Sequence, residues 1–401
     1  MLRQLGCGLL AVGLVVGVID VSEEPAWATS DQATSVKVGP TAFLAGMYAE
    51  AAIRGNGSFG SSFSPAGFHA SDGPSNSLGF VAIRDAAQPS WAAADAAGLV
   101  DGDFFVPGVP VEVWALKVGS VLGYNNHELS NADPALGNPN EIAGSLGSVT
   151  DATGTSGNNT VSWSSSAPFQ GLNIVKTYSL PQAGQRVDVT VTLTNSTGAP
   201  IADIYYGRGL DPDDGQLTVP DVYRSTNTIV SQISAGGSSS RVSAEFTRGS
   251  QISLYSTDPR SAVSRYFAGF ESSFNPVAVW AGTAPQFIGT VGSSATGDAG
   301  ILLAIKIDSL GAGQSTTFTF SYLLTESAGD EGGGGSGGGS GGSVTQEASP
   351  STLAATGPAS AEFSPIGTIA GLLVASGFGA IVAAGYLKRR RTRNLRSTLQ
   401  V

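Results

Sequence analysis

The densest group of carboxylates in the chain is the run Asp211-Pro212-Asp213-Asp214-Gly215. Calcium takes six to eight oxygen ligands, and three aspartates in one loop can supply several of them. The spacing is not that of an EF-hand loop, and proline and glycine in such a run are equally typical of an ordinary turn. The sequence therefore predicts either a turn or a calcium site whose ligands are Asp211, Asp213 and Asp214. Asp101-Gly102-Asp103 is a weaker candidate of the same kind.

Acid–base chemistry has few candidate residues, because the chain contains two histidines and one cysteine. His127 precedes Glu128, and with His69 this pair could contribute to a sugar-epimerising site in which a histidine and a carboxylate share proton transfer. The alternative is that these are polar loop residues. No Gly-x-Ser-x-Gly elbow and no His-Glu-x-x-His motif occurs in the sequence. We therefore predict no catalytic residues and a protein that is not an enzyme.

Aromatic side chains and net charge limit the possible ligands. Sugar rings could stack on Tyr205, Tyr206, Tyr223, Trp91, Trp114, Trp163 or Trp280, although most of these fall within strand patterns and are expected to fill the core. A glycan is thus one candidate for an unknown extracellular ligand. The chain has 20 basic and 31 acidic residues, a net charge of −11, and this composition argues against nucleic acid as a partner.

The first 28 residues have the pattern of a secretory signal peptide. Arg3 is followed by an uncharged apolar run from Leu5 to Ile19 and then by a polar stretch. Ala26-Trp27-Ala28 supplies the small-x-small pattern that a signal peptidase accepts, so we expect cleavage after Ala28. Cleavage would remove the cysteine, Cys7, and leave a thiol-free chain suited to an oxidising exterior.

The C-terminal region has the pattern of a single membrane span. Residues 366–387 carry no charge and would form a helix about 33 Å long at about 1.5 Å per residue, which matches a hydrocarbon core of about 30 Å. The basic tail 388–401 follows and is expected to stay in the cytoplasm, which places the rest of the protein outside the cell. The precursor is therefore expected to contact the membrane through this helix.

A pentapeptide, Leu353-Ala354-Ala355-Thr356-Gly357, lies just before the apolar span. Pentapeptide, span and arginine tail, in this order, resemble a sortase sorting signal of Gram-positive bacteria. The Leu-Ala-x-Thr-Gly form resembles substrates of the class E sortases of actinobacteria, although the common form of the signal has proline at the second position. The resemblance implies that a sortase attacks the Thr356 carbonyl, expels Gly357 and the following residues, and joins Thr356 to the peptidoglycan precursor. The alternative is a plain single-span anchor that is never cut.

Residues 328–352 are expected to form a flexible linker. They contain a run of glycine and serine from Gly332 to Ser343, and such chains are random coils that would span about 25–30 Å here. Removing the signal peptide takes away one basic and three acidic residues, and removing the segment after Thr356 takes away six basic and one acidic. The product keeps 13 basic and 27 acidic residues, a net charge of −14, which disfavours binding to anionic polymers.

The body, residues 29–327, has the pattern of a β-rich domain. Arg186–Thr194 alternates apolar and polar residues over nine positions, which indicates a half-buried strand. Other predicted strands are 111–118, 172–178, 201–206, 251–255, 277–280, 301–307 and 316–323. Short strands separated by Gly, Ser, Asn and Pro turns predict an all-β fold, an antiparallel β-sandwich that could be a large supersandwich.

Few short helices are expected, at 42–54, within 89–98 and at 261–270. The stretch from Asn173 to Asp213, together with the late strand containing Phe318 and Phe320, resembles uncharacterised bacterial surface domains and, more distantly, the large sandwiches of the mutarotase-like class. The resemblance implies a fold and does not by itself imply an activity. The sequence thus predicts a secreted surface protein that displays a β-sandwich for adhesion, ligand binding or wall structure. The alternatives are a domain that binds or modifies carbohydrate, and an uncut membrane-anchored ectodomain.

Overall fold

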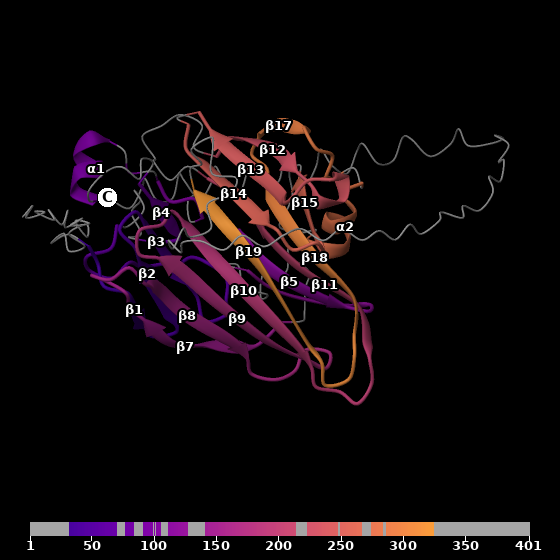
Figure 1. Ribbon diagram of the computed structural model, residues 1–401. Helices are drawn as coiled ribbons and strands as arrows, with labels where there is room; N and C mark the ends of the chain where they lie inside the picture. Colours follow the sequence, from indigo (N-terminus) through magenta and orange to yellow (C-terminus); the bar gives the residue numbers. More distant parts are fainter. Residues whose placement is uncertain are drawn as a thin grey trace, which may run out of the picture.

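The computed structural model describes residues 32–69, 77–83, 91–98, 100, 102–105, 111–126, 141–213, 223–247, 249–266, 274–283 and 286–324. Nearly all regular structure in this part of the chain is antiparallel β-sheet (Figure 1). The predicted all-β sandwich is therefore confirmed at this level. The signal peptide, the linker, the pentapeptide and the span at 366–387 lie outside the described residues. Within those residues, every helix is too short to cross a bilayer.

Two large sheets pack face to face. The nine-stranded sheet has the order β17-β12-β13-β14-β19-β10-β9-β8-β7. Its strands, in chain order, are β7 (Gly144–Thr150), β8 (Asn158–Ser165), β9 (Leu172–Pro181), β10 (Arg186–Asn195), β12 (Ser225–Ser231), β13 (Ser240–Phe246), β14 (Gln251–Ser256), β17 (Ser294–Gly297) and β19 (Ser315–Leu324). The six-stranded sheet has the order β16-β15-β18-β11-β5-β6. Its strands are β5 (Glu112–Val118), β6 (Val121–Asn126), β11 (Ile201–Leu210), β15 (Ser261–Tyr266), β16 (Phe287–Ile288) and β18 (Ile301–Leu310).

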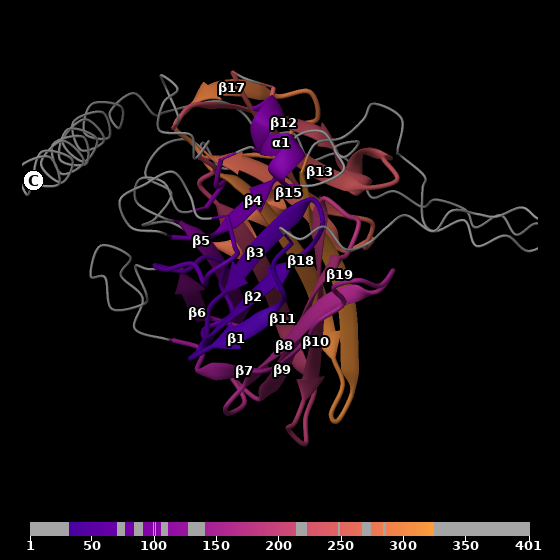
Figure 2. The same cartoon turned by 90° about the vertical axis from the view of Figure 1, so that its left-hand side faces the viewer.

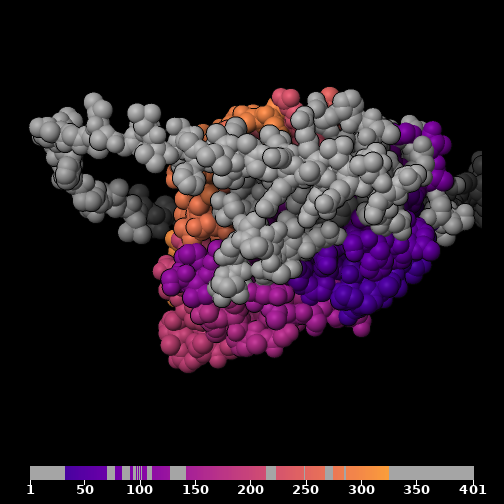
Figure 3. Space-filling view, turned by 180° about the vertical axis from the view of Figure 1, so that it is seen from behind, coloured from indigo at the N-terminus to yellow at the C-terminus, as the bar shows by residue number. Residues whose placement is uncertain are grey.

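A third sheet closes one open side of the sandwich. It consists of β1 (Val36–Val38), β2 (Thr41–Ala45), β3 (Ala49–Ile53) and β4 (Phe80–Ala82), in that order. In Figure 2 these strands lie between β5 and β6 on one side and β7 and β8 on the other. Figure 3 shows their indigo surface continuous with the magenta residues of the nine-stranded sheet. Strands β2 to β4 are entirely buried, so this sheet belongs to the core.

The core follows from the alternation in the strands. Val187, Val189, Val191 and Leu193 of β10 are fully buried, as the period-two pattern predicts. They pack with Phe318 and Phe320 of β19 and with residues of β5, β11 and β18 from the opposite sheet. The outward residues of β10 and β19 form a row of paired hydroxyls, for example Thr192 with Thr317 at 2.9 Å. The nine-residue register between these strands fixes both faces.

Three predicted elements are wrong. The helix expected at 42–54 is the β2–β3 hairpin, in which Gly46 donates to the carbonyl of Ala49. Burial of every residue in both strands outweighs the helix propensity of the alanines there. The helix expected from 261 is strand β15, which pairs with β18.

The strand expected at 277–280 is helix α2 (Pro276–Ala281). Asn275 accepts a hydrogen bond from the Val277 amide at the N-terminus, Pro276 occupies the first turn, and Gly282 ends the helix in a left-handed conformation. These capping residues make the segment a helix, although the residues between them favour a strand. Helix α1 (Trp91–Ala97) falls within the predicted 89–98, and a short 3₁₀ turn, η1 (Ile233–Ala235), follows β12.

Candidate functional site

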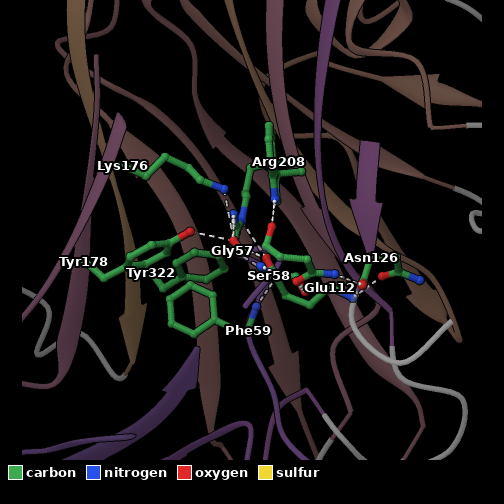
Figure 4. Close-up of polar contacts among 11 residues, drawn as sticks. Gly57, Ser58, Phe59, Glu112, Asn126, Lys176, Tyr178, Arg208 and Tyr322 are labelled. Carbon is green, nitrogen blue, oxygen red and sulfur yellow. Dashed lines mark hydrogen bonds and ion pairs between the residues drawn. The ribbon is translucent and has the colours of Figure 1, made fainter. Parts of the chain in front are cut away.

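The strongest chemical grouping in the described residues is a buried charged cluster between the two large sheets (Figure 4). Arg208 of β11 forms a bidentate ion pair with Glu112 of β5, with Nε–Oε1 at 2.6 Å and Nη2–Oε2 at 2.8 Å. The Tyr322 hydroxyl of β19 donates to Glu112 from the facing sheet. All three side chains are buried. Burial alone would lower the pKa of Arg208, but Glu112 raises it well above its usual value, so the guanidinium stays charged.

A lysine lies in the same layer of the core. Lys176 of β9 is fully buried, and its Nζ is 3.4 Å from the ring centre of Trp114 and 4.2 Å from that of Trp163. These distances are within the range of cation–π contacts. Burial and, to a smaller extent, the charge of Arg208 lower the pKa of Lys176 well below its usual value.

The loop after β3 brings its backbone into this cluster. The Gly57 carbonyl accepts hydrogen bonds from Lys176 Nζ at 3.2 Å, Tyr178 Oη at 2.5 Å and Arg208 Nη1 at 3.2 Å. The Phe59 amide donates to Glu112 Oε2 at 2.6 Å. Gly57 has φ of +75°, and a Cβ there would collide with Lys176, so glycine is required at this position.

The carbonyls just before Gly57 are bound in the same way. Asn56 accepts from the Trp114 indole and from Asn125 Nδ2, both at 2.9 Å, and Gly55 accepts from the Trp163 indole at 2.9 Å. Side chains from both large sheets therefore hold three consecutive carbonyls of one loop. These groups bond to one another, and the charged side chains among them are fully buried, so the cluster joins the third sheet to the sandwich.

The acidic run at 211–215 is only partly described. Asp211 and Asp213 are buried at the end of β11, and Asp298, which lies in the turn before β18, joins them. Each of the three offers a carboxylate oxygen, and these oxygens lie within 4.8 Å of one another. Asp214 lies outside the described residues. The chemistry of the three carboxylates suits a hard cation such as calcium, which stays a prediction. No sequence pattern indicated Asp298, because only the pairing of distant strands brings it beside Asp211 and Asp213.

The other carboxylate candidate has a structural role. Asp103 is fully buried and accepts hydrogen bonds from the amides of Gly79, Phe80 and Phe105. It therefore ties the chain before β4 to the segment that precedes β5. Asp101 lies outside the described residues, so the weaker calcium candidate at Asp101-Gly102-Asp103 stays a prediction.

Of the two histidines, only His69 lies in the described part of the chain. His69 Nδ1 is 3.0 Å from Glu50 Oε1, the His69 amide donates to Glu50 Oε2 at 2.7 Å, and the imidazole stacks on Trp91 with ring centres 4.1 Å apart. Glu50 of β3 is fully buried. The carboxylate partner of His69 is thus Glu50, whereas His127 and Glu128 lie outside the described residues.

The aromatic candidates separate into two groups. Trp91, Trp114, Trp163 and Tyr206 are buried, as most of them were expected to be, whereas Trp280 is exposed and Tyr205 half-buried. Tyr223 is half-buried in the turn before β12.

Two shallow grooves lie at the junction of the edge strands β1 and β7, and the one of about 350 Å³ is lined by Lys37, Glu141 and Leu146 among others.

Sequence comparison identifies no protein family and no curated protein that matches the chain. Solved structures that match the chain include a galactose mutarotase-like protein from Clostridium acetobutylicum, which is 9% identical over 75% of this chain and 100% of that one, with a TM-score of 0.33. A polysaccharide lyase is 13% identical over 76% of this chain and 34% of that one, with a TM-score of 0.27. A protein from the human microbiome described as a kojibiose phosphorylase is 9% identical, with a TM-score of 0.30; 71% of this chain spans only 29% of it. Similarities of this size do not define a function.

Proposed function

We propose that the chain is a secreted surface protein that a class E-type sortase joins to the cell wall through Thr356. In this proposal the β-sandwich is the displayed part, and its role is adhesion, ligand binding or wall structure. The sequence from Leu353 to the arginine tail supports the anchoring step, since pentapeptide, apolar span and basic residues follow one another as in a sorting signal.

The position of the folded body along the chain carries the proposal. Every helix and strand of the described residues falls between Val36 and Leu324. The predicted signal peptide ends at Ala28 and the predicted linker begins at residue 328, so neither overlaps an element of the body. Cleavage at both expected sites would therefore leave every strand of the sandwich intact.

The last strand provides a firm point of attachment for such a linker. Strand β19 pairs with β10 over nine residues on one side and with β14 on the other. Phe318, Phe320 and Tyr322 of this strand are also buried in the core. A pull on the residues after Leu324 would thus act on a central strand, which is held by two neighbours and by side-chain packing.

The test is the mass and C-terminal peptide map of protein released from purified cell walls by a muralytic enzyme. We expect a C-terminal peptide that ends at Thr356 and carries a wall fragment. The variant Thr356→Ala is expected to remain in the membrane fraction with residues 388–401 attached, whereas the neighbouring control Thr352→Ala should behave like wild type. Recovery of the wild-type chain only from the membrane, with its tail intact, would contradict the proposal in favour of an uncut single-span ectodomain.

A further inference from the structure

A row of three polar and aromatic side chains crosses the outer face of the six-stranded sheet. Tyr205 of β11 is opposite Lys117 of β5 and opposite Lys306 of β18. Residues that are paired in this way point to the same face of a sheet. Their neighbours Leu116, Tyr206 and Ile305 are buried in the sandwich core, so the row lies on the opposite, outer side.

Trp280 extends this row at the end of helix α2. Its ring centre is 6.4 Å from that of Tyr205, with the two planes at 74°, and Lys306 Nζ lies 4.9 Å from the Trp280 ring centre. The indole nitrogen donates to the Arg260 carbonyl at 3.1 Å. The indole is therefore held in place although 37% of the residue is exposed.

The sheet beneath α2 explains why Trp280 is presented here. Two residues along each strand from Lys117, Tyr205 and Lys306, the same face carries Ala115, Gly207 and Ala304. These residues have a methyl side chain or none, which leaves room for the helix. Val279 of α2 is buried in a small apolar cluster with Ala115 and Ala304. The helix thus packs against one half of the outer face, and Trp280 lies at its C-terminal end, next to the row of Lys117, Tyr205 and Lys306.

The charges around the rings are matched. Lys306 pairs with Asp308 at 2.7 Å, and the hydrogen bond from this pair raises the pKa of Lys306. The carboxylate of Asp308 is 85% exposed. Lys117 lies 5.8 Å from the Tyr205 ring centre and donates to the Gly119 carbonyl. The surface therefore offers ring faces, cationic donors and an anionic acceptor side by side, without a large local excess of either charge.

We propose that these five residues, Lys117, Tyr205, Trp280, Lys306 and Asp308, form an outer platform that binds a neutral glycan. A sugar ring has an apolar face that packs on an aromatic ring, and its hydroxyls require both donors and acceptors at the rim. The net charge of the chain, −11, disfavours a polyanion. This inference specifies the ligand class left open by the display function, and it rests on that function only for an extracellular setting.

The test is affinity electrophoresis of the full-length chain through gels that contain one polysaccharide each. The neutral probes are dextran, mannan, laminarin and arabinogalactan; alginate serves as the anionic probe and polyproline as a peptide probe. We expect at least one neutral polysaccharide to retard the chain. Trp280→Ala and Tyr205→Ala should each weaken this retardation by roughly tenfold or more in apparent Kd, as removal of a central aromatic contact does.

Phe63→Ala is the matched control, because Phe63 is an aromatic residue of equal exposure, 38%, in a different part of the fold. Its apparent Kd should stay within about twofold of wild type, and an unchanged near-ultraviolet circular dichroism spectrum would show that each variant is folded. The proposal is overturned if no neutral polysaccharide retards the chain, if only alginate or polyproline does, or if Phe63→Ala weakens binding as much as Trp280→Ala. None of these outcomes depends on cleavage at Thr356, so they leave the wall-attachment proposal to its own test.

Discussion

At the scale of single residues, the interior of this sandwich is unusual for the charges it holds. Glu112, Lys176 and Arg208 each occupy an inward position in an alternating strand, where the neighbouring inward residues are apolar or aromatic. A buried charge is costly unless it is paired and hydrogen-bonded. Here the partners come from both large sheets and from the loop after β3, so these residues depend on one another and on the backbone of Gly57.

The ion pair between Glu112 and Arg208 leads to a stability prediction. Glu112→Gln keeps the shape of the side chain but leaves Arg208 without a counter-charge, and we expect a loss of about 3–5 kcal/mol in the free energy of unfolding. Urea unfolding measures this loss. The control is Arg186→Gln, which breaks the exposed pair with Asp188 and should cost less than about 1 kcal/mol. Equal losses for the two variants would show that the buried pair contributes no more to the free energy of unfolding than the exposed pair does.

The lowered pKa of Lys176 predicts a pH dependence. Between this pKa and about 10.4, the value in the unfolded chain, the unfolded state binds more protons, so stability rises with pH. The free energy of unfolding of wild type should therefore increase relative to Lys176→Met, by at most about 1.4 kcal/mol per pH unit. Urea unfolding below about pH 10 avoids the tyrosines, which ionise in the unfolded state near that pH. If the free energies of unfolding of the two proteins changed with pH in the same way, the lowered pKa of Lys176 would be disproved.

At the scale of elements, capping residues, burial and close packing decide the secondary structure and position of a segment more than its own composition does. The segment Pro276–Ala281 is rich in residues that favour strands, yet it is a helix because Asn275 and Gly282 cap it. The alanine-rich segment 42–54 is a hairpin because both of its strands are buried in the core. Gly207 is a third example, since its missing side chain determines where α2 can pack.

Gly207 gives a prediction at this scale. An added Cβ would lie 2.8 Å from Pro276 Cβ and 2.9 Å from a ring carbon of Phe274, so Gly207→Ala should push α2 away from the sheet. We expect a loss of about 1–3 kcal/mol in the free energy of unfolding, measured with urea. Gly297→Ala in β17 is the control, since a Cβ there meets no atom within 4 Å, and its effect should stay within about 0.5 kcal/mol. A Gly207→Ala variant as stable as the control would rule out close packing of α2 on β11.

At the scale of the whole molecule, strands far apart in sequence become neighbours. The last strand, β19, lies between β10 and β14 in the middle of the largest sheet, and the first sheet closes the side of the sandwich beside β7 and β8. The body is therefore complete only when its C-terminal strand has joined it.

The linker gives a prediction at the scale of the whole molecule. Deletion of Gly332–Ser343 would shorten the reach of the linker from about 25–30 Å to roughly 18–22 Å. We expect the same melting temperature and the same cleavage at Thr356, but weaker labelling of intact cells by an antibody against the body. Replacement of the segment by an equally long serine–glycine sequence in a different order should restore the labelling. Unchanged labelling by the deletion variant would show that the linker does not set the exposure of the body.

The sequence by itself predicted the roles of the two ends, which lie outside the described residues, and determined the period of the strands. Alternation in β10 and β19 predicted both their strand structure and the face that each buries, because a side-chain period of two is a local property. Charged residues at inward positions, such as Lys176 and Arg208, were a readable signal of a buried polar cluster that sequence reasoning passed over. The partners of those residues were not readable, because no local pattern encodes contacts across sheets.

Only the tertiary structure decided which groups meet. Asp298 reaches Asp211 through the pairing of β11 with β18, and the carboxylate beside His69 is that of Glu50 from β3. Tyr205 and Trp280 were two among seven aromatic candidates until the sheet placed them together on the outside. The physical reason is common to all three cases. Strand order and register are set by burial of the whole core, and burial is a property of the complete fold and not of any one segment.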